Sequence, residues 1–161
     1  MLRKLLLMLG LCCTLAFSAH AQDKVQLFGG YSYMHFHNSP SESLNGWEIS
    51  GQYKFNDWLG GVADFDQHYG SGLTATTYLF GPQISWPSRV SPFGHLELGG
   101  AHISAGPFGS SSFSMALGGG IDTQLVPFLS WRIFQADYLM TQFGGGTQNN
   151  FRLSTGIVIH F

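Results

Sequence analysis

The segment WEISGQYKF, residues 47–55, alternates between two kinds of side chain at every position. One set is apolar, aromatic or small, and the other is polar or charged: Trp47, Ile49, Gly51, Tyr53 and Phe55 against Glu48, Ser50, Gln52 and Lys54. Successive side chains of a strand point to opposite faces, so this strand has an apolar face and a polar face. The last eleven residues, FRLSTGIVIHF, repeat the pattern with Thr155 as the exception. Two-faced strands of this kind predict a β-sheet that separates two different environments.

The composition indicates which environments these are. Only 10% of the residues are charged, against about 25% in an ordinary soluble domain, and the chain has 22 glycines and 15% aromatic residues. No stretch after residue 21 approaches the run of about 20 apolar residues that a membrane-spanning helix needs. A closed β-barrel is the other structure that satisfies its backbone hydrogen bonds in lipid. The sequence therefore predicts an all-β, antiparallel transmembrane barrel with its apolar face toward lipid.

Alternation and turn residues divide the chain into eight candidate strands, an even number that closes an antiparallel barrel. We expect them at residues 25–36, 46–55, 58–68, 74–86, 92–103, 112–123, 128–143 and 150–161. The connections at 56–57, 87–91 and 126–127 are tight, whereas those at 37–45, 69–73, 105–112 and 144–150 are mostly longer and rich in Gly, Ser and Asn. In outer-membrane barrels, short turns face the periplasm and longer loops face outward. We therefore expect both termini on the periplasmic side and long extracellular loops.

Two places break the regular pattern. Pro82 falls inside a predicted strand, where it cannot donate a ladder hydrogen bond, so we expect a bulge or a local break at Gly81-Pro82. Arg132 and Asp137 have opposite parity and can share the polar face only if one extra residue lies between them. We expect a second bulge near Phe134-Gln135; a simple change of facing along the strand is the alternative explanation.

Residues 1–21 have the features of a secretory signal peptide. Arg3 and Lys4 precede the apolar run Leu5–Phe17, and Ala19-His20-Ala21 fits the cleavage site. The run is too short for a membrane-spanning helix, and a lipoprotein site at Cys12 or Cys13 lacks the expected small residue before Cys12. The predicted mature domain, 22–161, then has no cysteine, five basic and nine acidic residues. This composition provides no basic surface for nucleic acid.

The sequence MALGGGIDTQLVPFLSWRIFQADYLMTQFG, residues 115–144, followed by GIVIHF, resembles the closing half of an OmpA-like outer-membrane barrel domain. The matching positions carry the Gly-rich strand, its terminal Asp, and the Arg and late Tyr of the next strand: Gly118, Gly119, Gly120, Asp122, Arg132 and Tyr138. FGGYSY and FNDWLGGVADF extend the resemblance loosely to most of the mature chain. It implies a small, structural, eight-stranded outer-membrane protein, without the peptidoglycan-binding domain of larger members.

The same resemblance implies partners and a route to the membrane. Phe161, with Ile157 and Ile159 at alternate positions before it, resembles the signal read by the barrel-insertion machinery. We expect that machinery and periplasmic chaperones as partners during biogenesis, outer-membrane lipid and lipopolysaccharide as surroundings, a monomer, no cofactor and no catalysis.

Alternation also predicts which charged residues line the lumen: Glu48, Lys54, Asp64, Asp66, Glu97, Arg132, Asp137 and Arg152, beside Gln52, Gln83 and His95. Buried charges are costly unless they are paired. We expect a plug of salt bridges and hydrogen bonds. A second interpretation, suggested by the OmpA-like resemblance, is a narrow gated pore in which an Arg-carboxylate pair exchanges partners, with Arg132 and either Glu48 or Glu97 as the candidate gate.

Other functions have weaker sequence support. His102 and Ser104 share a strand face and resemble the His-x-Ser element of lipid A deacylases, but no acidic residue lies between residues 103 and 121 to complete a triad. Histidines 35, 37, 68 and 102 are candidates for a metal site at the outer rim. A soluble eight-stranded ligand-binding barrel would also alternate, although its exterior would need more charge. Adhesion is disfavoured by loops of only about five to nine residues.

The tryptophans give a further test of the predicted register. Trp47, Trp58, Trp86 and Trp131 are expected on the lipid face near the membrane interfaces, because aromatic side chains form girdles there.

Overall fold

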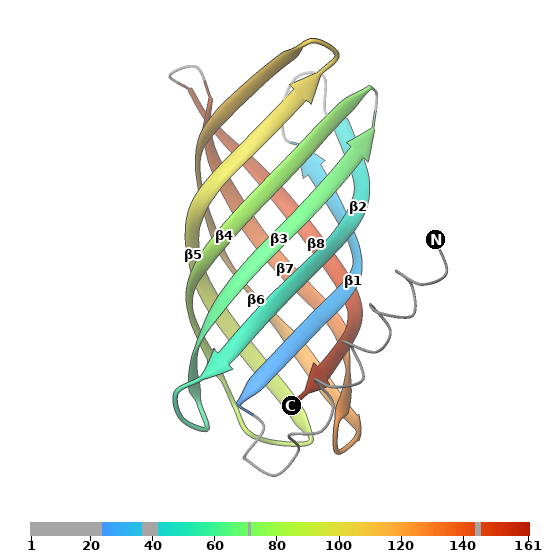
Figure 1. Ribbon diagram of the computed structural model, residues 1–161, viewed down its shortest axis with the longest axis vertical. Coiled ribbons are helices and arrows are strands. Elements are labelled where there is room, and N and C mark those ends of the chain that lie inside the picture. The colour runs from blue at the N-terminus through green and yellow to red at the C-terminus, as the bar shows by residue number, and fades with distance from the viewer. Residues whose placement is uncertain (1–23, 37–41, 71, 144–145) are drawn as a thin grey trace, which may run out of the picture.

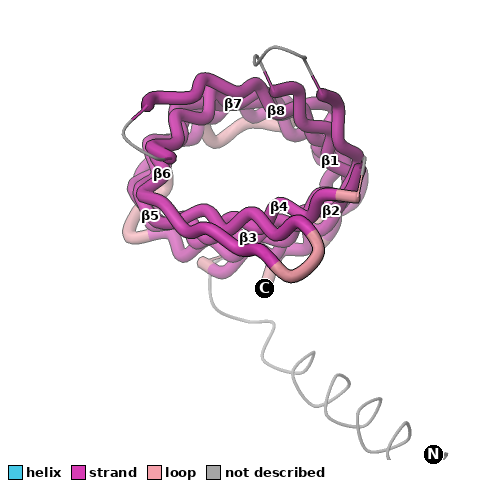
Figure 2. Tube along the Cα trace, turned by 90° about the horizontal axis from the view of Figure 1, so that it is seen from above, coloured by secondary structure: helices cyan, strands magenta, loops and turns pink. Residues whose placement is uncertain are grey.

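The computed structural model describes residues 24–36, 42–70, 72–143 and 146–161. These residues form one closed antiparallel barrel in which each strand pairs with its sequence neighbours and β8 pairs with β1. Figure 2 shows the ring of strands in cross-section. The strands are β1 (Val25–Phe36), β2 (Glu42–Lys54), β3 (Leu59–Gly70), β4 (Leu73–Ser85), β5 (Val90–Ala105), β6 (Phe108–Val126), β7 (Leu129–Phe143) and β8 (Gly146–His160). The predicted fold class and number of strands are confirmed.

The largest difference from the predicted boundaries lies at the end of the barrel far from the C-terminus. The expected loop at 105–112 is a turn at 106–107 between β5 and β6, and Gly106 has a φ of 57°. A glycine with positive φ at the first central position suits a two-residue hairpin turn. The prediction of long loops is wrong here because Ser and Gly pair in the hairpin ladder, and strand propensity is a weak constraint once a hairpin extends.

The C-terminus lies at the same end of the barrel as the β2–β3, β4–β5 and β6–β7 connections (Figure 1). We call this the turn end. Two backbone hydrogen bonds attach the last residue to the first strand: Val25 N–H donates to Phe161 O at 3.3 Å, and Phe161 N–H donates to Val25 O at 2.9 Å. The alternation of the final residues is therefore part of the seam that closes the barrel.

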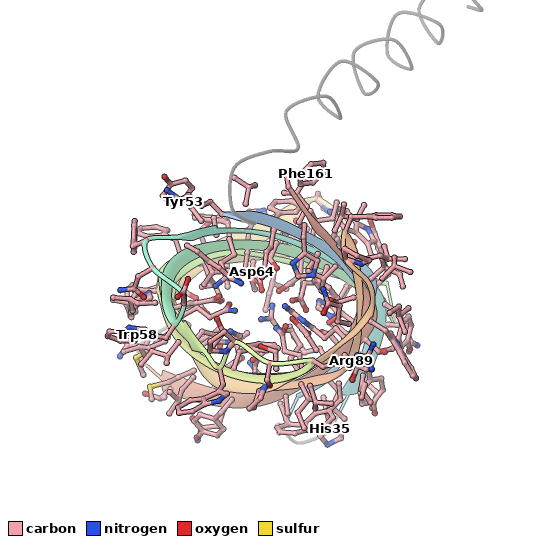
Figure 3. All side chains as sticks on the ribbon, turned by 90° about the horizontal axis from the view of Figure 1, so that it is seen from below. His35, Tyr53, Trp58, Asp64, Arg89 and Phe161 are labelled. Atoms are coloured by element: carbon pink, nitrogen blue, oxygen red, sulfur yellow. The ribbon has the colours of Figure 1, made fainter. Side chains whose placement is uncertain are left out.

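The exterior is mainly apolar and aromatic, and the interior is mainly polar. Tyr53, Trp58 and Phe161 point away from the barrel, whereas Asp64 points into it (Figure 3). All four predicted girdle tryptophans are exposed, and Trp58, Trp86 and Trp131 lie near the turn end. A soluble ligand-binding barrel has the opposite arrangement, so that alternative is wrong. The described part of the chain contains no helix long and apolar enough to cross a membrane.

The predicted bulge in β7 is confirmed. The pairing of β7 with β8 shifts by one residue between Arg132 and Gln135, and the pairing with β6 shifts at the same place. Ile133 and Phe134 both face outward, 40% and 45% exposed. Two consecutive outward residues allow Arg132 and Asp137 to share the lumen.

The irregularity at Pro82 is milder than a bulge. Gly81 and Pro82 pair with β3 but have no partner in the β4–β5 ladder, whose register is the same on both sides of the gap. The expected local break is present because proline brings no N–H donor to the ladder. The register does not shift.

Candidate functional site

A charge network centred on Arg152 fills the middle of the lumen. The side chain is fully buried. Its Nε donates to Asp137 Oδ2 at 2.8 Å, its Nη2 to Asp64 Oδ2 at 3.1 Å, and its Nη1 to Asp66. Glu48 Oε2 lies 3.7 Å from the same Nε. One guanidinium therefore contacts carboxylates from three other strands. Such a buried ion cluster is stable only when its geometry and extra hydrogen bonds offset desolvation.

Strand register brings the network together. Glu48 and Asp66 are directly paired between β2 and β3, and Asp137 and Arg152 between β7 and β8. Gln135 joins the two sides, since its Nε2 donates to Glu48 Oε1 at 2.9 Å and to Asp137 Oδ2 at 2.8 Å.

The network contains one carboxylate without a hydrogen-bond partner. Both oxygens of buried Glu97 lack a partner in the described structure, and His95 Nδ1 lies 3.8 Å from Oε1. The other ring nitrogen of His95, Nε2, is 2.7 Å from Asp137 Oδ1. Counting this glutamate, five buried carboxylates surround a single guanidinium.

His68 belongs to the lumen and not to the outer rim, so the predicted histidine metal site is wrong in this respect. Its Nδ1 is 3.1 Å from Asp66 Oδ1, and its Nε2 is 2.9 Å from Ser32 Oγ. On the exterior, His35 Nδ1 is 3.2 Å from Ser43 Oγ; His37 lies outside the described residues. Within the described ranges, no three His, Cys, Asp or Glu side chains form a group that could hold a metal ion.

Arg132 pairs with neither Glu48 nor Glu97, which corrects the predicted gate. It makes a bidentate pair with Asp122, from Nε to Oδ1 at 2.8 Å and from Nη2 to Oδ2 at 3.0 Å. The reason is register, because Asp122 and Arg132 are directly opposite each other on β6 and β7.

Two aromatic rings hold the Arg132 guanidinium between them. The Phe28 centroid lies 4.4 Å from Cζ and the Phe93 centroid 4.2 Å, both within cation–π range. This arginine–phenylalanine layer lies in the lumen between the Arg152 network and the turn end.

An apolar layer lies on the other side of the network. It consists of the buried side chains Met34, Leu44, Ala75, Leu79, Ala116 and Leu139. Leu139 lies farther from the turn end than Asp137 on β7. Leu44 likewise lies farther from the turn end than Glu48 on β2. The charges thus lie between an apolar layer and an arginine–phenylalanine layer.

The remaining predicted lumen cation, Lys54, is not part of the network. It is half-buried at the last position of β2 and lines a polar cavity in the mouth at the turn end. The lumen charges therefore form three groups: the network around Arg152, the Arg132–Asp122 pair and the mouth.

The candidate deacylase pair lies on the exterior. His102 Nδ1 is 2.8 Å from Ser111 Oγ, its directly opposite residue on β6. Ser104 is two positions further along the same face of β5. Among the described residues, no carboxylate forms a hydrogen bond or ion pair with His102, so the histidine has a serine partner in the position where a triad needs an acid.

Sequence reasoning missed several members of the lumen, among them His68 and Gln135. His68 has the same parity as Asp64 and Asp66, so alternation alone would have placed it inside. Gln135 was visible only through the bulge, which turns it inward after two outward residues.

The fold is that of the small eight-stranded outer-membrane β-barrels. Neisserial surface protein A superposes with a TM-score of 0.65 at 17% identity, over 86% of this chain and 97% of that one. The N-terminal barrel domain of Pseudomonas aeruginosa OprF gives 0.56 at 11% identity, over 86% and 98%. Ail, the attachment invasion locus protein of Yersinia pestis, gives 0.54 at 18% identity, over 84% and 97%. No protein-family model matches the chain, and no curated protein sequence is significantly similar to it.

Proposed function

We propose that this protein is a structural barrel of the bacterial outer membrane whose lumen is closed to solutes. The observation that carries this proposal is the full burial of Arg152 and its carboxylates between two packed layers. An eight-stranded barrel is just wide enough for side chains to fill. Paired charge, the apolar layer and the arginine–phenylalanine layer together fill the lumen at and around the network. The apolar exterior and the shared fold support the membrane assignment.

Planar-bilayer recording of the purified protein tests the closed lumen. We expect a silent bilayer for the wild type and for Arg132→Ala, because the Arg152 network and the apolar layer remain in that variant. Heat-dependent gel mobility of the same samples shows that the barrel is folded. Discrete single-channel openings of folded wild-type protein would refute the proposal.

A narrow gated pore is the second candidate, and the observation in its favour is that the buried carboxylate of Glu97 accepts no hydrogen bond among the described residues. Such a carboxylate beside an ion cluster provides an alternative hydrogen-bond acceptor for a cation of the cluster, which is what partner exchange requires. Under this function, the wild type opens, and Glu97→Gln changes the size or frequency of openings.

We further propose the following biogenesis. Residues 1–21 direct export and are removed, both ends of the mature domain 22–161 face the periplasm, and the monomer lies among outer-membrane lipid and lipopolysaccharide. Periplasmic chaperones and the insertion machinery handle the chain, with Ile157, Ile159 and Phe161 as the signal. Deletion of Phe161 should then reduce outer-membrane accumulation in cells. Unchanged accumulation would refute the role of Phe161.

Binding of sulfated polyanions is not part of the proposed function. One structure of Yersinia pestis Ail was solved in complex with the heparin analogue sucrose octasulfate. In this protein, the described residues toward the end opposite the turn end, 33–36, 42–51, 67–70, 72–79, 98–118, 139–143 and 146–151, include no Lys or Arg. Sulfate and phosphate groups are bound mainly by such cations.

A further inference from the structure

We infer that a groove on the outer wall of the barrel binds one acyl chain of a membrane phospholipid. The groove runs over β4, β5 and β6 and has a volume of about 540 Å³, within the range of small-molecule sites. Its walls are outward-facing side chains: Pro82, Ile84, Trp86, Pro92, Leu96 and Leu117. None of the described residues that line it is Lys, Arg, Asp or Glu, so the groove suits an apolar ligand.

The floor of the groove is a position without a side chain. Gly94 on β5 lines the groove, and its direct partners are Ile84 on β4 and Gly119 on β6. Because neither glycine has a side chain, the outward face is recessed at this row. One row nearer the middle of the strands, Leu96 and Leu117 face each other and form the wall.

Packing within the barrel does not account for the glycine at position 94. A Cβ on Gly119 would lie 2.3 Å from the backbone oxygen of Phe93, so close strand packing requires that glycine. A Cβ on Gly94 would have its nearest contact at 3.6 Å, with the backbone oxygen of Gly118, which is an ordinary van der Waals distance. Gly94 also lacks the positive φ of Gly72 and Gly106. The fold would therefore accept a side chain at position 94, and its absence keeps the groove open.

The position of the groove identifies its occupant as a lipid chain. The apolar outer wall is the surface of the barrel in contact with lipid, and the groove is continuous with it. Trp86 is 70% exposed at the turn-end rim of the groove, and indole rings of membrane proteins lie at the level of the headgroups. From Trp86 the groove passes Ile84 and Pro82 toward the middle of β4. A chain that enters the membrane from the headgroups runs in the same direction.

Van der Waals contact supplies the affinity, because lipid chains are themselves apolar and no hydrophobic driving force remains between them and the barrel. Atoms that line an unfilled recess lose these contacts. A flexible acyl chain can follow a recess one row wide, whereas the convex wall of a second barrel would touch the rim and leave the floor empty. The choice of phospholipid rests on the orientation proposed above, since phospholipid forms the periplasmic leaflet of the outer membrane.

The test is native mass spectrometry of the purified protein in detergent micelles, titrated with palmitoyl-oleoyl phosphatidylethanolamine. We expect the folded monomer to bind one phospholipid with higher affinity than any further one. Gly94→Leu fills the groove with a side chain and should weaken binding of the first phospholipid about tenfold, through the loss of chain contacts. Ile84→Ala, which lowers one wall and adds no bulk, should weaken it by a smaller factor. Heat-dependent gel mobility shows that each variant is folded.

Gly29→Leu is the matched control, because Gly29 is an exposed glycine on β1, outside the groove, whose added Cβ would have no atom within 4 Å. Its phospholipid binding should equal that of the wild type. Equal weakening by Gly29→Leu and Gly94→Leu would refute the site, as would several phospholipids bound with one affinity. A protein dimer that Gly94→Leu abolishes would assign the groove to a second copy and overturn the lipid assignment. The measurement depends neither on conductance nor on the leaflet, so the groove and the closed lumen can fail separately.

Discussion

Arg152 on β8 and Asp137 on β7 are directly opposite in register and joined by an ion pair of 2.8 Å between Nε and Oδ2. The pair fixes the guanidinium on one wall of the barrel. Its two Nη atoms then reach Asp64 and Asp66 on β3, three strands away around the ring. The pair between the neighbouring strands β7 and β8 thus positions the guanidinium of Arg152 to bond with carboxylates on β3, across the lumen.

Replacement of the central cation should therefore destabilise the barrel strongly. Arg152→Met keeps most of the volume but leaves several buried carboxylates without their cation, which costs about 3–5 kcal/mol. Urea unfolding in lipid bilayers, followed by circular dichroism and gel mobility, measures the loss. Lys24→Met removes an exposed cation and should change stability by less than about 0.5 kcal/mol. A similar small effect of Arg152→Met would contradict the central role of Arg152.

Glu97 should behave in the opposite way from the other network carboxylates. Glu97→Gln removes a buried charge that accepts no hydrogen bond, so the free energy of unfolding should stay unchanged or rise by about 1–2 kcal/mol. Asp137→Asn breaks contacts with Arg152 and His95 and should lower stability by about 2 kcal/mol or more. The same urea experiment compares the two variants. Equal losses of stability in Glu97→Gln and Asp137→Asn would mean that the Glu97 carboxylate has interactions as strong as those of Asp137.

The bulge in β7 should be dispensable once its extra residue is removed. Deletion of Phe134 reduces the separation of Arg132 and Asp137 from five positions to four, so both side chains can face the lumen from a regularly alternating strand. We expect the deletion variant to keep the heat-dependent gel shift of a folded barrel. Phe134→Ala, which keeps the chain length and the bulge, should keep it as well. Loss of the gel shift in the deletion variant alone would show that the barrel needs the bulge itself.

Gly118 should not tolerate even one added methyl group. A Cβ there would overlap Asp137 Oδ1 and lie 2.5 Å from the backbone oxygen of Ala136. Gly118→Ala should therefore cost about 2–3 kcal/mol through overpacking. The control is Gly29→Ala, whose added Cβ has no atom within 4 Å and should change stability by less than about 0.5 kcal/mol. Equal unfolding midpoints for the two variants would contradict the close packing of β6 against β7.

The amino-acid sequence by itself determined the strands, their facing and the bulge in β7. These features are local, because side-chain alternation has a period of two and a change of parity between Arg132 and Asp137 requires one extra residue. The outward tryptophans and the lumen position of Arg152 follow from the same rule.

Only the tertiary structure decided which charges meet and where the hairpins end. Alternation places Arg132 and Glu48 on the same face but does not encode the stagger of one strand against the next, and stagger made Asp122 the partner of Arg132 and Arg152 the centre of the network. The turn at 106–107 is decided by continued backbone pairing between β5 and β6, to which Ser and Gly side chains offer little resistance. Facing is a property of each strand alone, whereas partners and hairpin lengths depend on how the strands pair around the closed ring.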